Sequence, residues 1–376
     1  MNTPQTNFNI NNIKSTFLRS IFGLQNQHLP IWLMRQAGRY LPEYLAIRNK
    51  AGSFMNLCTN VDLATEVTLM PINRFNLDAA ILFSDILVVP DAMGLGLSFV
   101  ENEGPRFAKT INTISDLNTL QTDNIMDRLQ YVPNIIKNLK TKLPTNIPLI
   151  GFSGSPFTLA CYMIEGASSK NHSKIKAIMY NNSDFMHQLL TIITNSIITY
   201  LNAQIEAGCD TVMIFDSWGG ILTDRDFLEF SLPYITQICK SIHNSYNGIP
   251  IPKISFTRGL NHMIGNIAST KVIDVIGVDW TCNLSYAREL TESHTTTNSN
   301  KVTLQGNLDP VLLLVGDKPA LKKQVERILH DYYISNNESL NNLIFNLGHG
   351  VLPHTNPDHV AYLVDIVHDI SMNFKM

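Results

Sequence analysis

Eight short apolar runs, separated by longer stretches that mostly carry a helical pattern, constrain the fold of this chain most strongly. Each run is too short for a typical helix, β-branched residues recur among the runs, and most of their residues are apolar rather than alternating strictly with polar ones. This continuous apolar character is typical of parallel strands that are buried on both faces. The predicted strands are 31–34, 79–83, 148–152, 211–215, 252–256, 272–278, 302–305 and 343–346.

The stretches between the runs carry apolar residues at helical spacing. The predicted helices include 57–70, 184–207, 224–240, 317–334 and 357–371. Eight strands that alternate with helices predict an α/β fold of the (β/α)8 TIM barrel type. A length of 376 residues with 44% hydrophobic content suits one large barrel or two ordinary domains. Because no linker is visible, we expect a single domain over residues 1–376.

Residues 1–25 are expected to form an N-terminal extension with a short helix. Ile13, Phe17, Ile21 and Phe22 have the spacing of an amphipathic helix that packs on the body of the protein. The segment lacks the apolar core of a signal peptide, although a transit peptide is also compatible with its composition. No stretch of the chain approaches the roughly 18 unbroken apolar residues of a membrane span. We therefore expect a cytoplasmic protein.

Polar residues and glycines follow six of the predicted strands directly. In a (β/α)8 barrel the active site lies at the C-terminal ends of the strands, so these residues mark the expected site. Each of them alone would also fit an ordinary turn. They are 84–85, 153–154, 216–220, 279–280, 306–307 and 347–350. By contrast, the polar stretch 291–301 is predicted to be a solvated loop, and 244–252 a Gly/Pro connection.

The charge of the chain argues against a broad surface for nucleic acid or membrane. Charged residues make up only 16% of the sequence, and the formal net charge is −3. An anionic partner would therefore have to be bound by a few placed cations. The five cysteines are scattered, odd in number and without a CxxC pair, which favours a reducing compartment.

Arg35 and Arg39 are the candidate cations. They lie four residues apart and would share a face in either a strand or a helix. Two guanidinium groups on one face repel each other unless an anion lies between them, and arginine binds carboxylates with two parallel hydrogen bonds. The alternative is that each arginine pairs with a structural acid such as Glu43. Spacing alone does not decide between these interpretations.

Four further side chains at strand ends are candidates, and each has an ordinary structural alternative. Asp85 could accept hydrogen bonds from substrate N–H groups, or it could simply cap a helix. Tyr162, about two turns into a predicted helix, could donate to a ligand or lie in the core. Ser217 in "FDSWGG" and His349 in "NLGHG" are flanked by glycines, which allow close approach of a ligand but also occur in turns.

Several common kinds of site lack their motifs. The sequence contains no GxxxxGK[ST] loop for nucleotide phosphates and no GxSxG nucleophile elbow. It also lacks HExxH, HxE with PCxxC and paired CxxC, so a dedicated zinc site is without its usual ligands.

Taken together, these stretches resemble the uroporphyrinogen decarboxylase family of haem biosynthesis. They appear in the family's order from about residue 30 to 357, which is nearly the whole chain. With tryptophan at position 218, the stretch "FDSWGG" resembles that of the bacterial members. The matching stretches are "MRQAGRYLPEY", "LDAAILFSDILVVPDAMG", "GFSGSPFTLACYMIEG", "FDSWGG", "VDWT", "LQGNLDP" and "NLGHGVLPHT".

The resemblance implies a (β/α)8 barrel that needs no cofactor or metal and is usually a homodimer. Such an enzyme removes the four acetate carboxyl groups of uroporphyrinogen III as CO2 and releases coproporphyrinogen III. The implied substrate-binding positions are Arg35, Arg39, Asp85, Tyr162, Ser217 and His349.

Within this set, Asp85 and Arg35 are expected to be catalytic. A carboxylate at Asp85 would collect the pyrrole N–H groups and stabilise a cationic ring, and Arg35 would handle the departing carboxylate or deliver a proton. Two alternatives remain open at this point. One is a zinc-dependent methyltransferase on a related barrel, and the other is a tetrapyrrole-binding protein without catalytic activity.

Overall fold

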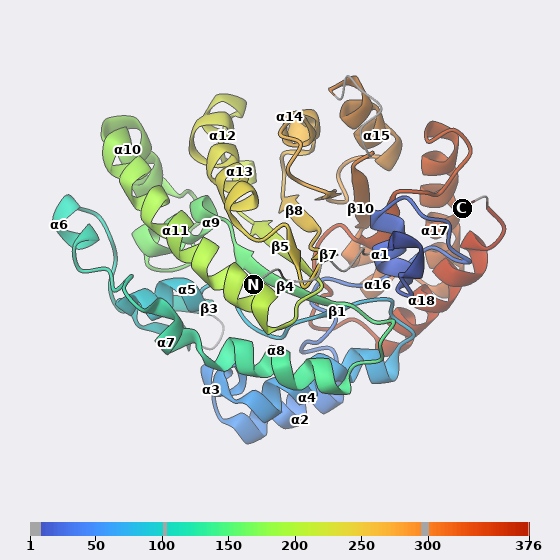
Figure 1. Cartoon of the computed structure of the whole chain (residues 1–376), viewed down its shortest axis with the longest axis horizontal. Coiled ribbons are helices and arrows are strands. Elements are labelled where there is room, and N and C mark those ends of the chain that lie inside the picture. The colour runs from blue at the N-terminus through green and yellow to red at the C-terminus, as the bar shows by residue number, and fades with distance from the viewer. Residues whose placement is uncertain (1–8, 101–103, 295–300, 375) are drawn as a thin grey trace, which may run out of the picture.

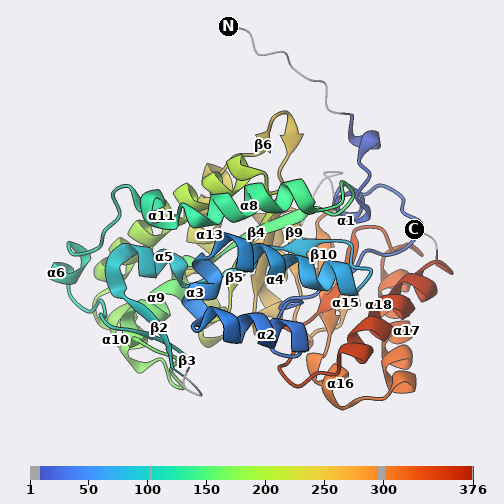
Figure 2. The ribbon, with the colours of Figure 1, turned by 90° about the horizontal axis from the view of Figure 1, so that it is seen from below.

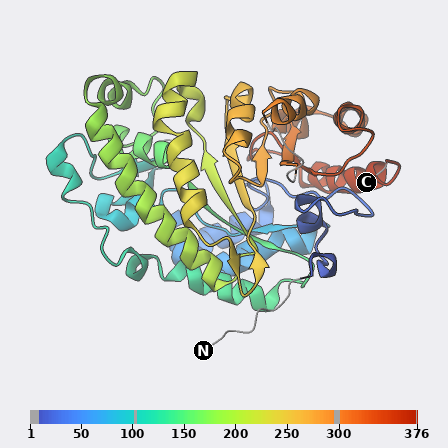
Figure 3. The ribbon, with the colours of Figure 1, turned by 45° about the horizontal axis from the view of Figure 1, so that its top comes forward.

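A curled parallel sheet forms the centre of the computed structural model, which describes residues 9–100, 104–294, 301–374 and 376. Its seven strands run in the order β1-β4-β5-β8-β9-β10-β11, and helices surround it (Figures 1 and 3). The strands are β1 (Ala80–Ile81), β4 (Leu149–Gly154), β5 (Thr211–Asp216), β8 (Lys253–Thr257), β9 (Val275–Gly277), β10 (Thr303–Leu308) and β11 (Leu343–Leu347). Most of their residues are buried, as expected for parallel strands covered on both faces.

The expected first strand, 31–34, is wrong as a strand. Only Ile31 pairs, as a single parallel bridge to Phe345 of β11. On its other side, the Ile31 carbonyl accepts a hydrogen bond of 2.9 Å from the Asp78 backbone N–H. Extended pairing stops there because the Met34 N–H donates to the side chain of Asn346 at 3.1 Å, and a turn follows. One short segment therefore links the two edges of the sheet into a barrel-like arrangement.

The helices agree with the predicted ones, except that two of the predicted helices are each divided into two. The range 57–70 is broken at Asn60, whose side chain caps the second helix by accepting from Leu63 N–H. The range 224–240 is broken at Ser231, just before Pro233, which cannot continue the hydrogen-bond ladder of the first helix. The longer helices are α4 (Val61–Arg74), α8 (Tyr131–Lys142), α11 (Ser183–Ala207), α17 (Lys318–Ser335) and α18 (Pro357–Ser371). The shorter ones include α2 (Pro42–Ala51), α3 (Phe54–Thr59), α9 (Pro156–Glu165), α10 (Ser173–Asn181), α12 (Asp224–Phe230), α13 (Leu232–Ser241), α14 (Ile264–Ser269), α15 (Leu284–Ser293) and α16 (Pro310–Val315).

Two short antiparallel hairpins were not predicted. One pairs β2 (Leu97–Val100) with β3 (Gly104–Phe107). The other pairs β6 (Ser245–Tyr246) with β7 (Ile249–Pro250), within the expected Gly/Pro connection. The expected loop 291–301 is also partly wrong, because α15 continues to Ser293; residues 295–300 lie outside the described residues.

The predicted N-terminal helix is confirmed. Helix α1 (Thr16–Ile21) buries Phe17 and Ile21, and Figure 2 shows it beside the C-terminal part of the chain. The Ser15 hydroxyl caps the helix by accepting from the Leu18 N–H at 3.2 Å. No helix within the described ranges is both long and apolar enough to cross a membrane.

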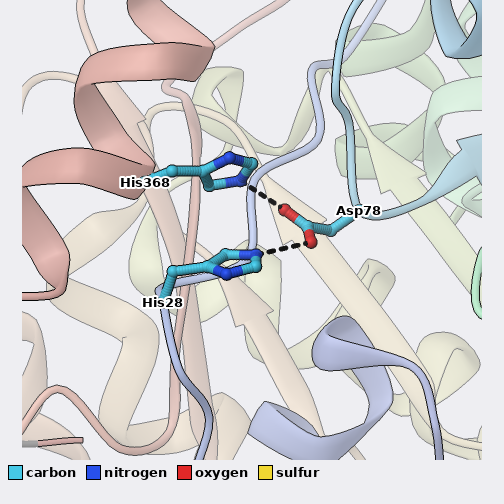
Figure 4. Close-up of side chains that lie close together, drawn as sticks. All are labelled: His28, Asp78 and His368. Atoms are coloured by element: carbon cyan, nitrogen blue, oxygen red, sulfur yellow. Dashed lines mark hydrogen bonds and ion pairs between the residues drawn. The ribbon is translucent and has the colours of Figure 1, made fainter.

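A buried carboxylate, Asp78, fixes the N-terminal end of the sheet (Figure 4). Its two oxygens accept hydrogen bonds from His28 at 3.1 Å and from His368 of α18 at 2.9 Å. The same carboxylate accepts the Ile31 N–H at 2.8 Å. Burial acts to raise the pKa of Asp78, but these hydrogen bonds outweigh it and lower the pKa below its usual value. Asp78 therefore joins β1 to segments from both ends of the chain.

We expect Asp78→Asn to lower the free energy of unfolding at pH 7 by about 2–4 kcal/mol, because the amide cannot accept all three bonds as strongly. The carboxylate stabilises the fold only when ionised. The difference from wild type is therefore present above the unfolded-state pKa of about 3.9 and disappears as the pH falls through the lowered folded-state value. Urea unfolding at a series of pH values measures it.

Asp331→Asn on α17 is the matched control. Its carboxylate is exposed and lies 3.7 Å from Arg327, so the expected loss is under about 0.5 kcal/mol. Equal losses in the two variants would show that Asp78 does not hold the sheet.

Candidate active site

The side chains named from the sequence lie at the C-terminal ends of the strands, a region that we call the mouth of the barrel. Arg35 follows the Ile31 bridge, Asp85 follows β1, and Ser217 follows β5 directly. His349 comes two residues after β11. Tyr162 is the seventh residue of α9, which follows β4, as the sequence predicted. The topology thus brings all of these candidates to one end of the sheet.

Arg35 is held in an unusual backbone conformation beside the last strand. Its φ of 59° lies in the left-handed region, which non-glycine residues seldom adopt. The neighbouring Met34 carbonyl accepts the Val351 N–H at 2.9 Å, so the loops after Ile31 and after β11 are joined. A Cβ atom on Gly350 would lie 2.4 Å from the Cδ of Arg35. Gly350 therefore leaves the space through which the arginine side chain passes.

The guanidinium of Arg35 is open to solvent and yet desolvated by the surrounding protein. The side chain is exposed, but burial lowers its pKa, and the charges of Arg39 and Arg258 act in the same direction. The charges of Asp85 and Tyr162 oppose this shift. A partly desolvated cation of this kind is stabilised when an anion binds to it.

Arg39 lies in the same irregular turn and not on a strand or helix, so the face-sharing argument from its spacing does not apply. The suggested partner, Glu43, instead pairs with Arg74 at 2.9 Å. Among the described residues, neither Arg35 nor Arg39 has an ion pair or a hydrogen bond from its guanidinium group. Their charges are nonetheless close enough to influence each other. The structural alternative based on Glu43 is thus wrong.

Asp85 fixes a turn with one oxygen but does not cap a helix, and its role as a substrate contact stays a prediction. One oxygen, Oδ1, accepts the Leu87 N–H at 2.8 Å, so the side chain does fix the turn before α5 (Val88–Pro90). Burial raises the pKa of Asp85, and the hydrogen bond and the charge of Arg35 only partly offset this. No hydrogen bond to its second oxygen is present within the described part of the chain. Asp85 can therefore still accept from a ligand.

Ser217 and Trp218 are positioned by a fully buried carboxylate, Asp216. It accepts hydrogen bonds from three hydroxyl groups: Ser155 at 2.6 Å, Thr158 at 2.9 Å and Ser231 at 2.8 Å. The sequence drew attention to "FDSWGG" but not to this role of its aspartate. Ser155 follows β4, Thr158 lies in α9, and Ser231 follows α12. Because Asp216 accepts hydrogen bonds from all three segments, it fixes the loop that carries Ser217.

Trp218 connects this loop to Tyr162. The two ring centroids are 6.0 Å apart, and the ring centroid of His172 lies 4.6 Å from that of Trp218. Tyr162 is half-buried, and burial raises its pKa with a further contribution from Asp85. It stays a neutral phenol that can donate its proton in a hydrogen bond.

His349 is held in its uncharged form. Burial and the charges of Arg35 and Arg258 lower its pKa to about 4. The ring stands edge-on to Trp280, with 6.3 Å between centroids. A neutral imidazole offers one N–H donor, so His349 can bind a carboxylate without adding to the positive charge of the mouth.

One basic residue of the mouth was missed. Arg258 follows β8 directly, and its charge acts on both Arg35 and His349. The sequence offered a weak signal, since "SFTRG" places a basic residue and a glycine after a predicted strand, as at the other strand ends. That strand end was not among the six that we singled out.

Burial raises the pKa of all five cysteines, so each thiol is held in its protonated form. Cys58 and Cys239 are buried in α3 and α13, and burial raises the pKa of Cys239 to about 12. Cys282, after β9, has its pKa raised to about 11, again mainly by burial. Among the described residues, one group has three potential metal ligands close together, namely His28, Asp78 and His368 at the opposite end of the sheet. The described mouth therefore does not combine thiolates and imidazoles.

Known proteins resemble this chain over nearly its whole length. Residues 12–370 match the family described as uroporphyrinogen decarboxylase (URO-D). A uroporphyrinogen decarboxylase of Neisseria meningitidis serogroup C is 47% identical over 359 residues, covering 96% of this chain and 97% of that protein. The uroporphyrinogen decarboxylase of Tolumonas auensis is 48% identical over 355 residues, covering 94% of this chain and 96% of that protein.

A solved structure supports the fold. A methyltransferase from Methanosarcina mazei superposes with a TM-score of 0.75, covering 94% of this chain and 98% of that one. Its sequence identity is only 19%, so this similarity concerns the fold alone. The sequence matches, in contrast, combine high identity with almost complete coverage of both partners. This chain belongs to the uroporphyrinogen decarboxylase family.

Proposed function

We propose that this chain converts uroporphyrinogen III to coproporphyrinogen III by releasing its four acetate carboxyl groups as CO2. One observation supports this most directly. Among the described residues, the guanidinium groups of Arg35 and Arg39 pair with no acid, and the charge of Arg35 acts on Asp85, a carboxylate that keeps one oxygen available. The substrate offers carboxylates for the arginines and pyrrole N–H groups for the aspartate. The mouth and the substrate are thus complementary in both respects.

The chemistry needs a sink for the electrons of the broken bond. Protonation of a pyrrole carbon makes a cationic ring, and the bond to the acetate carboxylate then breaks with its electron pair moving into that ring. CO2 leaves, a proton adds to the remaining methylene to give a methyl group, and the ring carbon loses its proton. Each acetate therefore consumes one proton in total. The chain has to stabilise the cationic ring and hold the carboxylates in place.

Asp85 has the properties required of the group that faces the ring. Transferring an ionised carboxylate into a desolvated site is unfavourable, as its raised pKa indicates. A cationic ring with N–H donors would compensate for that cost, so the interaction strengthens as the reaction proceeds. Arg35, whose charge already acts on Asp85, is the group for the departing carboxylate or for proton delivery. The lowered pKa of Arg35 makes proton delivery easier than for an ordinary arginine, which is a very weak acid.

The remaining candidates are assigned to binding. Arg39 supplies a second cation, and neutral donors come from Tyr162, Ser217 and His349. One domain, a homodimer and a cytoplasmic location, expected from the sequence, are retained as proposals. The two alternative functions are less well supported. A zinc-dependent methyltransferase would need a thiolate and imidazole set that the described mouth does not offer, and a purely binding protein would not need Asp85 in a desolvated position.

Anaerobic incubation with uroporphyrinogen III, followed by oxidation and a count of the carboxyl groups left on the product, should give coproporphyrin for the wild type. In Asp85→Asn we expect kcat to fall about 100-fold or more, because the charge that stabilises the ring is lost while the shape is kept. Melting temperature and substrate KM should change much less.

Asp365→Asn, an exposed acid on α18, controls for loss of a charge elsewhere and should keep wild-type turnover. An Asp85→Asn enzyme as fast as the wild type would refute the role given to Asp85. Wild-type protein that leaves all carboxyl groups in place would refute the decarboxylase, and stoichiometric zinc in that protein would favour the methyltransferase.

The neutral state of His349 predicts a pH effect on stability. Its folded-state pKa of about 4 lies below the unfolded value of about 6.5, so the unfolded chain binds a proton more readily between these values. Wild-type stability should therefore fall as the pH drops from about 6.5 towards 4. His349→Asn, which cannot titrate, should lack this part of the decline when both proteins are unfolded in urea.

The same substitution tests the binding role. Asparagine keeps a neutral N–H donor, so His349→Asn should raise KM by less than about 3-fold, whereas His349→Ala should raise it about 10-fold. Parallel stability curves for wild type and His349→Asn across this range would show that His349 is not held neutral. Equal KM values for the Asn and Ala variants would show that it is not a donor.

A further inference from the structure

Arg258 lies at the mouth and has no role in the function proposed above. Its backbone N–H donates to the carbonyl of Asp216 at 3.2 Å, so it lies next to the loop that carries Ser217. Its side chain is half-buried. Within the described ranges of the chain, no ion pair or hydrogen bond of its guanidinium group is present. A half-buried charge of this kind is costly unless something else stabilises it.

The local backbone fixes the position of Arg258. A Cβ atom on Gly220 would lie 2.6 Å from the Arg258 carbonyl oxygen, so the loops after β5 and β8 pack backbone against backbone. Gly259, which has a φ of +80°, makes this turn possible immediately after the arginine. Gly220 and Gly259 thus allow the loop that carries Ser217 and the loop that carries Arg258 to pack closely. An arginine that only faces solvent would not need such packing.

The aromatic ring of Trp280 fixes the guanidinium group itself. The Cζ atom of Arg258 lies 5.6 Å from the ring centroid, a cation–π arrangement that leaves the N–H donors available. Trp280 in turn contacts His349 edge-on. Gly348 allows this, because a Cβ atom there would lie 2.2 Å from the Trp280 backbone nitrogen. The arginine is therefore oriented by an uncharged group and not by an acid.

The acid of the adjacent loop, Asp279, is already used by its own loop. Its oxygens accept from the Gly259 N–H at 2.7 Å, from Asn261 Nδ2 at 2.7 Å and from Thr281 Oγ1 at 2.6 Å. Burial acts to raise the pKa of Asp279, but these bonds lower it below the usual value. The carboxylate is thus ionised and fully engaged in ordering the loops, so the N–H groups of Arg258 stay free for a ligand.

We propose that Arg258 binds one of the peripheral carboxylate arms of the substrate, on the side of the mouth that faces away from Asp85. This inference rests on the decarboxylase function proposed above. Arg35 is the cation that acts on Asp85, whereas Arg258 acts on Arg35 and His349. In the sheet, β4 and β5 lie between β1, which Asp85 follows, and β8, which Arg258 follows, so Arg258 lies away from the carboxylate that faces the reacting ring. Within the described part of the chain the guanidinium groups of Arg35, Arg39 and Arg258 pair with no acid, and the charges of Arg39 and Arg258 both act against that of Arg35. A ligand with several carboxylates removes that repulsion.

Space for such an arm exists beside Arg258. A hollow of about 410 Å3 lies between the loops after β8 and β9, and Gly259, Asn261, Thr281 and Tyr286 are among the residues that line it. Its lining combines polar and apolar surface, and His262 and Cys282 also belong to it. Arg258 does not line the hollow itself but directly precedes Gly259, which does, so an arm bound by Arg258 would have room to extend there.

A peripheral contact of this kind stabilises the bound substrate and the transition state equally. Removing it should therefore raise KM and leave kcat nearly unchanged. In this respect Arg258 differs from Asp85, which faces the changing charge of the ring. The split between the two kinetic constants separates a binding role from a structural one, since a disordered mouth would lower kcat as well.

The test compares Arg258→Gln and Arg258→Lys with the wild type. Porphyrin fluorescence anisotropy at low salt measures the Kd of uroporphyrin, a stable oxidised form that keeps all eight carboxylates. We expect Arg258→Gln to raise this Kd about 10- to 100-fold, and Arg258→Lys to raise it less, because a charge-assisted bond is lost in the first and weakened in the second. With uroporphyrinogen, KM should rise in parallel while kcat changes less than about 3-fold.

Arg327→Gln is the matched control, since it removes the same charge from an exposed position on α17 and should leave Kd unchanged. Coproporphyrin identifies the arm. If Arg258 binds a propionate, Arg258→Gln weakens both porphyrins; if it binds an acetate, only uroporphyrin is weakened. Either result supports the proposal.

An unchanged Kd for both porphyrins in folded Arg258→Gln would overturn the proposal, as would wild-type protein that binds neither porphyrin. Turnover is scored separately. Wild-type protein that binds porphyrins through Arg258 but never decarboxylates uroporphyrinogen would refute the proposed enzyme activity and leave this inference standing.

Discussion

Everything at the mouth of this protein depends on how the sheet is closed at Ile31. A single bridge to Phe345 on one side and a hydrogen bond from Asp78 on the other link the edges of a sheet whose strands come from opposite ends of the chain. If the closure opened, Arg35 would lose its place beside His349. Asp78 strengthens it by accepting the Ile31 N–H and two imidazole N–H groups with one buried carboxylate. Ile31, Phe345 and Asp78 therefore link the two edges of the sheet with only a few hydrogen bonds.

The two ends of the barrel use buried carboxylates in different ways. At the N-terminal end, Asp78 is matched by hydrogen-bond donors, and its lowered pKa shows that the folded state favours its charge. At the mouth, burial raises the pKa of Asp85, and the guanidinium groups of Arg35 and Arg39 pair with no acid among the residues that the structure describes. The first arrangement stabilises the fold, whereas the second is unfavourable until a ligand completes it. Such a distribution is expected where stability is sacrificed for binding.

Much of the architecture could be predicted because hydrophobic burial leaves a local trace. Seven of the eight predicted strands are present in the sheet, and α18 has the predicted bounds. The errors arise where a contact distant in sequence overrides the local pattern. Asn346 takes the N–H of Met34 and ends the strand that "IWLM" suggests. A cap at Asn60 divides a helix that the apolar spacing makes continuous.

The sequence by itself determined the succession of strands and helices, the side chains at the strand ends and, through its motifs, the family. These follow from local chemistry, since burial selects apolar runs and each motif is written in consecutive residues. Only the tertiary structure decided which of those side chains meet, that Glu43 pairs with Arg74, and that His349 is neutral. It also revealed Arg258 beside Trp280. Charge pairing and desolvation depend on distances between residues far apart in sequence. A local sequence pattern therefore cannot predict either of them.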